Sequence, residues 1–369
     1  MKKIGMDLGK RQTDVCVLDE QGNVEQRCRI KTRRSALSKL LANKEECEVA
    51  IESCRDSGWV HGHIKSLGHS VVVIDTTRAR SIGIGLGRRK TDRRDAEALA
   101  RALYAGVAPR AHVLSTQAQR LRDVLQARQQ LVSHRVQIIT MLRGQMQATG
   151  TQLPSCSTQS FGHMLRASDI PQVQLPHVQS LLKTLGELDV QIQMLEYQLT
   201  NLARQHEAFE RLCTVPGVKL IVTLTFIATI DDPYRFGNAH QVQAFLGLVP
   251  SEHSTGGRRR TGGITRCGNA LARRMLVQAA LVMLRSKVAQ DDPLVVWAKQ
   301  IEKRRGHKKA AVALARRLAG VLWAMWIDGT EYDPKGLARE SFQGMTRRQR
   351  LAEAETRQMR TAQMKAQSL

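Results

Sequence analysis

The pattern of apolar and polar positions changes character about a third of the way along the chain. In the first hundred residues, short apolar runs alternate with turns rich in Gly and Asn. These runs predict two strands within 3–19 and single strands at 46–52 and 70–74. Helical spacing predicts helices over 35–44 and 57–67, and another from Asp92 onward. This mixture is typical of an α/β domain.

Beyond residue 108 the apolar positions follow helical spacing only. Two long amphipathic segments, 108–150 and 174–208, flank a break with Pro, Ser and Gly at 154–176. They predict either an antiparallel coiled-coil hairpin or an ordinary helical bundle. Apolar helices are expected to follow, ending near Ile230, over 270–288 and over 308–326.

The charge balance points to a polyanionic partner. The chain has 369 residues, of which 57 are Lys or Arg and 33 are Asp or Glu, for a net charge of +24. An excess this large indicates DNA or RNA as the partner but does not specify an activity. Aromatic residues make up only 4% of the chain, which weakens the case for an oligonucleotide-binding barrel with stacking platforms.

Cysteine usage and hydropathy indicate the compartment. The seven cysteines form no C-x-x-C pair, so we expect reduced thiols in a cytosolic protein. The amino terminus has no apolar signal-peptide core, and we expect no membrane span because no apolar run approaches ~18 residues.

A compact cluster of acids and bases begins the helix at Asp92. Asp92 and Asp95 are three residues apart and should share one face of that helix. Basic residues surround them: Arg88, Arg89, Lys90, Arg93 and Arg94. The carboxylates could hold a divalent metal while the cations bind phosphate. Alternatively, the acids cap the helix and the basic side chains are simply solvated.

Two further acids precede this pair on predicted strands. Asp7 lies in the first strand and Glu52 ends the strand at 46–52, so the four acids follow the order strand, strand, helix, helix. With its motifs Met6-Asp-Leu-Gly-Lys10, Ala50-Ile-Glu-Ser53 and Lys90-Thr-Asp-Arg-Arg-Asp-Ala96, the chain resembles the DEDD insertion-sequence transposases of the insertion-sequence 110 family.

The resemblance implies an architecture and a cofactor. It implies an α/β RNase H-like (RuvC-like) domain over 1–107, in which Asp7, Glu52, Asp92 and Asp95 hold Mg²⁺ or Mn²⁺. A coiled-coil helical region over 108–208 and a mainly α-helical C-terminal transposase domain over 209–335 would follow. A basic, charged tail over 336–369 would end the chain.

A Gly- and Arg-rich stretch follows Pro250. Its cations are Arg258, Arg259, Arg260 and Arg266, and Ser and Thr hydroxyls lie near its first Gly pair. Taken alone, the stretch is typical of a phosphate-binding or disordered basic loop. The resemblance implies that one of its hydroxyls is a nucleophile. Counting back from Cys267-Gly-Asn269 selects Ser254, which we favour, and counting forward from Pro250 selects Thr255.

Pro216-Gly217 separates two predicted helices and is followed by Lys219. The segment resembles a helix-hairpin-helix turn, whose backbone N–H groups bind DNA phosphate. Lys219 replaces the usual second glycine and could contact phosphate itself. A plain Pro-Gly turn explains the sequence equally well.

The combined resemblance implies a recombinase that cleaves and rejoins DNA through a covalent phosphoserine link. Its partners would be element-end and target DNA, a noncoding guide RNA and further copies of itself in a dimer or tetramer. It would act in the bacterial cytoplasm, associated with the nucleoid. Two other functions use the same residues: a metal-dependent junction endonuclease that attacks with water, and a non-enzymatic nucleic-acid-binding protein.

Overall fold

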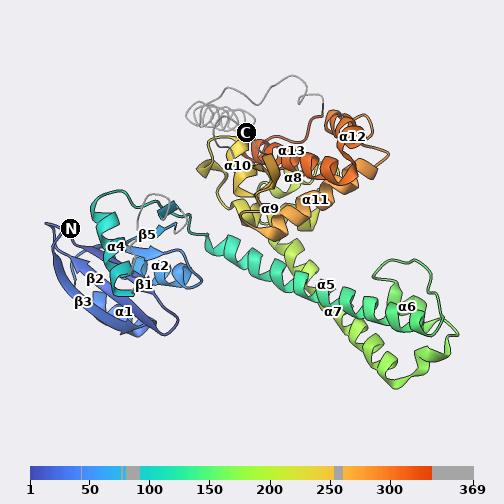
Figure 1. The fold of residues 1–369 in the computed structure, drawn as a ribbon, viewed down its shortest axis with the longest axis horizontal. Coiled ribbons are helices and arrows are strands. Elements are labelled where there is room, and N and C mark those ends of the chain that lie inside the picture. The colour runs from blue at the N-terminus through green and yellow to red at the C-terminus, as the bar shows by residue number, and fades with distance from the viewer. Residues whose placement is uncertain (43, 76–77, 80–91, 253–260, 335–369) are drawn as a thin grey trace, which may run out of the picture. The chain divides into compact units, whose positions relative to one another are not determined.

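The computed structural model describes all residues except 43, 76–77, 80–91, 253–260 and 335–369 (Figure 1). The chain forms two compact units that divide between Leu114 and Ser115. The first unit is a mixed α/β structure and the second is almost entirely helical.

The first unit is built on a five-stranded sheet in the order β3-β2-β1-β4-β5 (Figure 1). Its strands are β1 (Lys3–Leu8), β2 (Gln12–Leu18), β3 (Val24–Lys31), β4 (Glu48–Glu52) and β5 (Ser70–Ile74). β1, β2 and β3 are antiparallel neighbours, whereas β1, β4 and β5 run parallel. The strands expected from the short apolar runs are confirmed, and β3 is an additional strand that the pattern did not predict.

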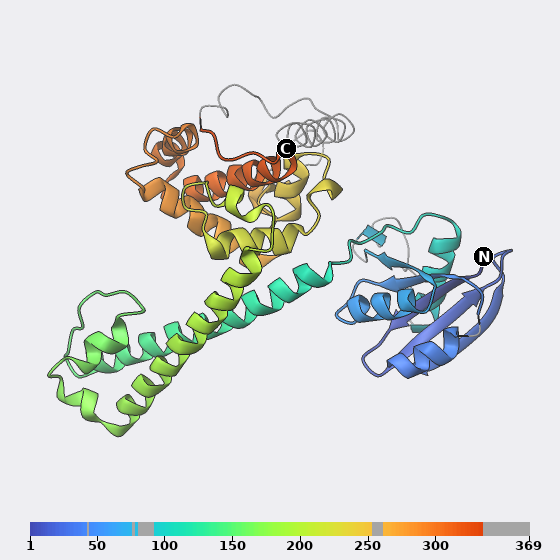
Figure 2. The ribbon, with the colours of Figure 1, turned by 180° about the vertical axis from the view of Figure 1, so that it is seen from behind.

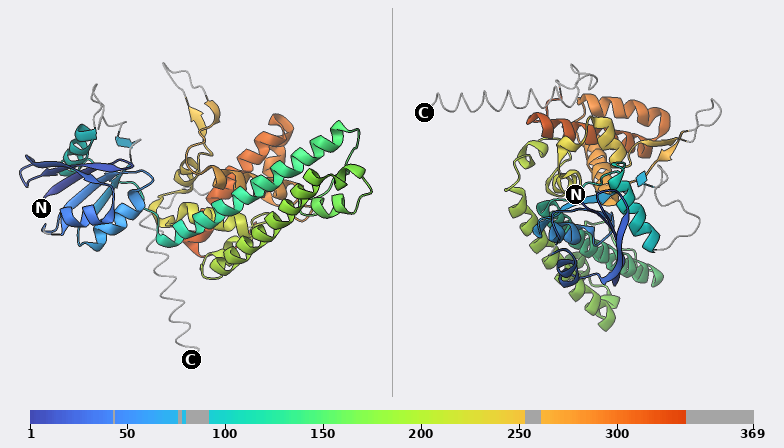
Figure 3. Two further views of the ribbon diagram at one scale, coloured as in Figure 1. Left: turned by 90° about the horizontal axis from the view of Figure 1, so that it is seen from below. Right: turned by 90° about the vertical axis from the view of Figure 1, so that its left-hand side faces the viewer.

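Helices cover both faces of this sheet. Helices α1 (Arg34–Leu41) and α2 (Ser57–Ser66) bury their apolar sides on one face, and α4 (Asp92–Tyr104) packs on the other (Figure 3). α4 approaches β1 closely because β1 has a glycine at the crossing point. A Cβ on Gly5 would lie 2.5 Å from the Ala100 nitrogen and would clash with the Ala96 carbonyl.

The second unit begins with two long helices, α5 (Thr116–Ala148) and α7 (Pro176–Ala203), which pack against each other (Figure 2). Arg128 on α5 pairs with Glu196 at 2.5 Å, and Arg135 pairs with Asp189 at 2.9 Å. Because residue numbers rise along α5 as they fall along α7, the helices are antiparallel. The segment expected to be a simple break contains the short helices α6 (Phe161–Arg166) and η1 (Pro171–Gln174).

Neighbouring buried positions on both long helices are mostly four or three residues apart, with wider intervals near the middle of each helix. On α5 these include Leu121, Leu125, Ile139, Leu142 and Met146. On α7 they include Val178, Leu182, Leu185, Ile192, Leu199 and Ala203. In the register set by the two ion pairs, Leu125 lies opposite Leu199 and Ile139 lies opposite Leu185. The two ion pairs lie between these apolar pairs along the helices.

The remaining helices pack around α13 and form the largest apolar core of the chain. They are α8 (Phe209–Leu212), α9 (Leu220–Ile230), η2 (Pro233–Arg235), α10 (Ala239–Phe245), α11 (Ala270–Arg285), α12 (Pro293–Arg305) and α13 (His307–Asp328). A two-stranded hairpin, β6 (Pro250–Glu252) with β7 (Thr261–Ile264), projects from this bundle. The sequence pattern did not predict α10, α12 or this hairpin.

Helix α13 corrects one expectation from the sequence. Among the described helices it is long and apolar enough to cross a membrane, with a mean hydropathy of 1.4, although no such run was expected. However, 78% of that apolar window is buried inside the protein, and Trp323 donates its indole N–H to the Pro233 carbonyl at 2.8 Å. The helix therefore forms the centre of a core.

Candidate functional site

Three acids lie side by side on the face of the sheet that α4 covers. Asp7 on β1 is directly opposite Asp14 on β2, and Met6 pairs with Ile51, so Glu52 is the β4 neighbour of Asp7. Side chains alternate between the faces of a strand. Cys16 on β2, in phase with Asp14, packs against α4. We call Asp14, Asp7 and Glu52 the acidic row.

The start of α4 points toward the acidic row. Tyr104, at the end of α4, lies against Gly22 in the β2–β3 turn, beyond the end of β2 that is far from Asp7. The helix therefore runs antiparallel to β1, and its first turn is at the acidic end of the sheet. Asp95 is a half-buried residue of that turn. Asp92 is the first residue of α4, and its side chain lies outside the described part.

Asp14 is an acid that the sequence analysis missed. Its carboxylate is buried, with only 4% of the residue exposed, and both its oxygens accept from Arg29 Nε at 3.0 and 3.1 Å. Like charges directly opposite each other destabilise a sheet, so the Arg29 guanidinium compensates a carboxylate that faces Asp7. The phase of Asp14 with the apolar Cys16 and Leu18 was the available signal.

The described acids are not close enough together to coordinate a metal ion in this structure. Among the described residues, no three His, Cys, Asp or Glu side chains lie close enough to hold a metal ion. The donor set itself suits Mg²⁺, because Asp7, Glu52 and Asp95 are half-buried carboxylates at one end of one sheet face. The basic residues Arg88, Arg89 and Lys90 lie outside the described residues, as does the side chain of Arg93. Arg94 is exposed on α4.

In the second unit, the β6–β7 hairpin borders the stretch that contains the predicted nucleophile. Ser254, its alternative Thr255 and the cations Arg258, Arg259 and Arg260 lie outside the described residues. The base of the hairpin is held by main-chain hydrogen bonds: Thr265 donates to the Val249 carbonyl at 2.9 Å, and Arg266 donates to the Gly247 carbonyl at 3.1 Å. The Arg266 side chain is exposed, and its φ of 58° is in the left-handed region.

Two glycines allow the segments before β6 and after β7 to approach each other. Gly247 and Gly268 both have positive φ; a Cβ on Gly247 would clash with the Cys267 backbone, and a Cβ on Gly268 would clash with the Phe245 carbonyl at the end of α10. Arg273 on α11 donates to the carbonyls of Leu246 and Gly268, at 3.2 and 3.1 Å, and to that of Cys267. The segments Phe245-Leu-Gly-Leu248 and Cys267-Gly-Asn269 thus form one clamp, which fixes both ends of the hairpin to the bundle.

The Pro216-Gly217 turn is packed against the bundle. Gly217 has a φ of +79°, and a Cβ there would lie 2.5 Å from the Ala279 carbonyl on α11. Lys219 precedes α9, and its ammonium donates to the Cys213 carbonyl at 3.4 Å. These contacts favour the plain turn, in which glycine serves close packing.

Comparison with known proteins agrees with both halves of the chain. A family model described as "Transposase" for the DEDD domain of IS110 elements matches residues 4–150. A second, described as "Transposase IS116/IS110/IS902 family", matches residues 209–293.

Similar proteins include three bacterial transposases. The transposase of insertion sequence IS1328 from Yersinia enterocolitica is 30% identical, over 89% of this chain and 98% of its own length. The transposase of IS1111A from Coxiella burnetii is 28% identical over 88% and 89%. A probable family 20 transposase from Pseudomonas aeruginosa is 28% identical over 90% and 99%. The chain, with its mixed α/β sheet followed by a helical region, therefore belongs to the IS110 family of DEDD insertion-sequence transposases.

Proposed function

We propose that this transposase cleaves and rejoins DNA strands with Ser254 as the nucleophile and the acids Asp7, Glu52, Asp92 and Asp95 as a metal-binding set. The observation that carries the proposal is the acidic end of the sheet. Asp7 and Glu52 share one face on neighbouring strands, and the helix that covers this face begins there with Asp92 and Asp95. The strand order and the mixed pairing support an RNase H-like fold.

In the proposed reaction, the Ser254 hydroxyl attacks a DNA phosphorus, loses its proton and forms a new phosphate ester. The bond from phosphorus to one deoxyribose oxygen breaks, and that oxygen leaves as a hydroxyl after taking up a proton. The number of phosphoester bonds is unchanged, so the reverse reaction with another DNA end rejoins the strands without ATP. A bound Mg²⁺ or Mn²⁺ would stabilise negative charge on the phosphate in the transition state.

The protein's own groups would position this chemistry. Arg29 compensates the negative charge of Asp14. Asp7 and Glu52, the other two acids of the row, lie at the end of the sheet where α4 begins. Arg273 and the two glycines hold the base of the hairpin that leads to Ser254. The net charge of +24 favours binding of the DNA backbone and permits the guide RNA.

Each of the four regions expected from the sequence would have its own role. We propose that residues 1–107 carry the acids and that the antiparallel helices within 108–208 form a coiled coil which joins protomers in a dimer or tetramer. Residues 209–335 would carry the nucleophile, and 336–369 would form a basic tail. The 4-and-3 spacing of buried positions on α5 and α7 supports the coiled coil.

The test is to trap the covalent intermediate. The protein is incubated with labelled element-end DNA, the noncoding RNA adjacent to the element and Mg²⁺, and a protease-sensitive DNA–protein band is sought on a denaturing gel. Ser254→Ala should abolish the band while DNA binding persists, and Ser251→Ala, three residues away in β6, serves as the matched control. Thr255→Ala distinguishes the two alignments of the nucleophile.

The acids are tested in the same assay. Asp7→Asn and Glu52→Gln should each abolish the band, whereas the exposed Glu45→Gln should leave it unchanged. Cleavage without any covalent band, insensitive to Ser254→Ala, would instead support the endonuclease that uses water. If neither the unsubstituted protein nor any variant cleaves DNA, although each still binds it, the result would support the non-enzymatic function.

A further inference from the structure

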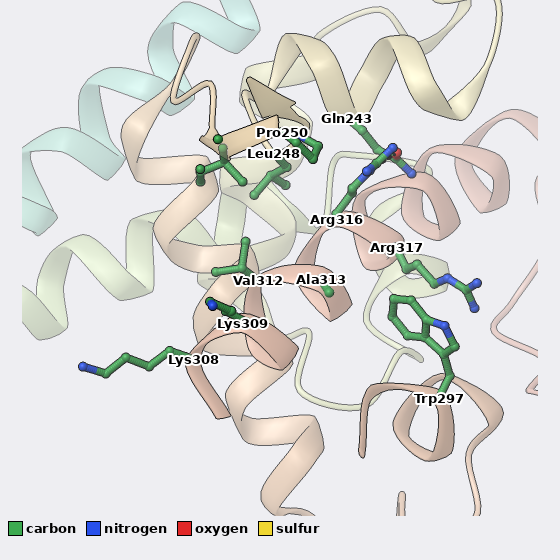
Figure 4. A pocket seen from close by; sticks show the side chains of 13 residues that line it. Gln243, Leu248, Pro250, Trp297, Lys308, Lys309, Val312, Ala313, Arg316 and Arg317 are labelled. Carbon is green, nitrogen blue, oxygen red and sulfur yellow. Dashed lines mark hydrogen bonds between the residues drawn. The ribbon is translucent and has the colours of Figure 1, made fainter. Parts of the chain in front are cut away.

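A cavity lies at the foot of the β6–β7 hairpin, within the second unit. Its volume is about 730 Å³ (Figure 4). The hairpin side contributes Leu248, Pro250 and Ile264, and α13 contributes Val312 and Ala313. Gly262 and Gly263 also line it, so part of the β7 wall has no side chains. The size is within the range of small-molecule and cofactor sites.

The α13 side of this apolar space is basic. Lys308, Lys309, Arg316 and Arg317, all on α13, line the cavity, and the described residues that line it include no Asp or Glu. Within the described part of the chain, none of these four forms an ion pair. Positive charge without an internal partner favours an anionic ligand.

Two of the arginines are already oriented. Arg316 donates from Nε to the Gln243 side-chain oxygen at 2.8 Å. The Arg317 guanidinium lies over the Trp297 ring, 3.8 Å from its centroid (Figure 4). A guanidinium and an indole stacked at the edge of an apolar cavity form a planar surface on which another flat, aromatic group can stack.

We propose that this cavity binds one unpaired nucleotide of the DNA strand that the hairpin engages. The base enters the apolar space between Pro250 and Val312, and the flanking phosphates contact the α13 cations. The inference rests on the proposed function for the choice of DNA, because Ser254 is only two residues beyond Glu252, the last residue of β6. A nucleotide held at the foot of the hairpin fixes the register of the strand relative to the nucleophile.

Another occupant to consider is the chain's own tail. The residues after Gly336 are rich in arginine, so their charge has the same sign as that of the cavity. Like charges disfavour that contact, and the complementary charge of a phosphodiester favours the nucleic acid.

The test fills the cavity and measures binding without catalysis. Val312→Trp places a large side chain in the space, and Val282→Trp, at an exposed position on α11, is the matched control. Fluorescence anisotropy is measured, without divalent metal, for a labelled DNA duplex, the same duplex with one unpaired nucleotide, and an RNA duplex with the same bulge. Thermal unfolding of each variant checks that the bundle remains folded.

We expect Val312→Trp to weaken binding of the bulged DNA about tenfold, since base stacking supplies that much affinity or more, and to leave the perfect duplex unchanged. Val282→Trp should bind all three probes with the same affinity as the unsubstituted protein. Equal loss for perfect and bulged DNA, or no loss for either, would overturn the proposal, and so would a loss confined to the RNA.

A second variant addresses the case in which Val312→Trp does not fold. Arg317→Ala removes an exposed side chain and should reduce the preference for the bulged over the perfect DNA duplex. An unchanged preference would refute the stacking surface. Because binding needs no covalent step, these results are independent of the band that tests Ser254: either can fail while the other succeeds.

Discussion

Replacing Gly5 with alanine tests whether the contact between β1 and α4 supports both the fold and the acidic end of the sheet. The new Cβ would lie 2.5 Å from the Ala100 nitrogen and clash with the Ala96 carbonyl. Both atoms belong to a helix backbone, so no side chain can rotate away. An ordinary contact needs roughly 3.5 Å or more between such atoms, so α4 must retreat by at least about 1 Å.

Two losses should follow from this retreat. Overpacking of a well-packed core costs about 1–3 kcal/mol, and we expect the upper end because the clash is with backbone. The start of α4 would also move relative to Asp7, and a shift of about 1 Å in a catalytic group can lower a rate by roughly 10²-fold. Urea unfolding measures the first loss, and the yield of covalent DNA adduct measures the second.

Gly62→Ala is the matched control within the same unit. Gly62 lies inside α2, and a Cβ there meets nothing within 4 Å. Alanine at such a helical position should leave stability unchanged or raise it by about 0.5–1 kcal/mol. If Gly5→Ala unfolds at the same urea concentration as the original protein, the close contact between α4 and β1 is refuted.

Three further changes have defined outcomes. Gly268→Ala should destabilise the protein by about 2–4 kcal/mol, because positive φ and a backbone clash combine; Gly329→Ala, with positive φ in open space, should cost about 1 kcal/mol, and equal unfolding midpoints for the two would contradict the clamp. Arg135→Leu should cost about 2 kcal/mol by leaving Asp189 unpaired, while the double variant with Asp189→Leu should regain most of that stability; a double variant no more stable than the single one would be inconsistent with this account. Burial lowers the pKa of His206 below its usual 6.5, so the unfolded chain binds a proton that the folded protein does not, and stability should fall as pH drops below about 6.5. In His206→Phe the unfolding midpoint should depend less on pH over this range, and an unchanged dependence would exclude His206 as a cause.

The sequence predicted the strands that are buried on both faces. β1, β2, β4 and β5 contain short apolar runs, so hydrophobicity located them and placed Asp7 and Glu52 on them. β3 is an edge strand with exposed, mostly polar residues, which resembles a loop to any pattern based on hydrophobicity. The β6–β7 hairpin was also missed, because strands of three and four residues are too short to show a period.

The missed site residues share a different cause: they act through tertiary contacts. Asp14 becomes notable only when β2 is paired with β1, which sets it opposite Asp7. Arg273 gains its role from three carbonyls on segments far from it in sequence or in the turn before its helix. The α13 cations resemble an ordinary solvated helix face until the hairpin and α12 close the cavity around them.

The matched spacing of buried positions and ion pairs along α5 and α7 constrains how these two helices can change length in evolution. Inserting residues into α5 or α7 alone would shift every facing pair beyond the insertion and separate Arg128 from Glu196 or Arg135 from Asp189. Both helices must gain or lose a whole heptad together to keep the partners matched, a step of about 10 Å along the helix axis. In relatives, α5 and α7 should therefore differ in length by the same number of heptads, and single-residue insertions should be confined to the α6–η1 segment between them.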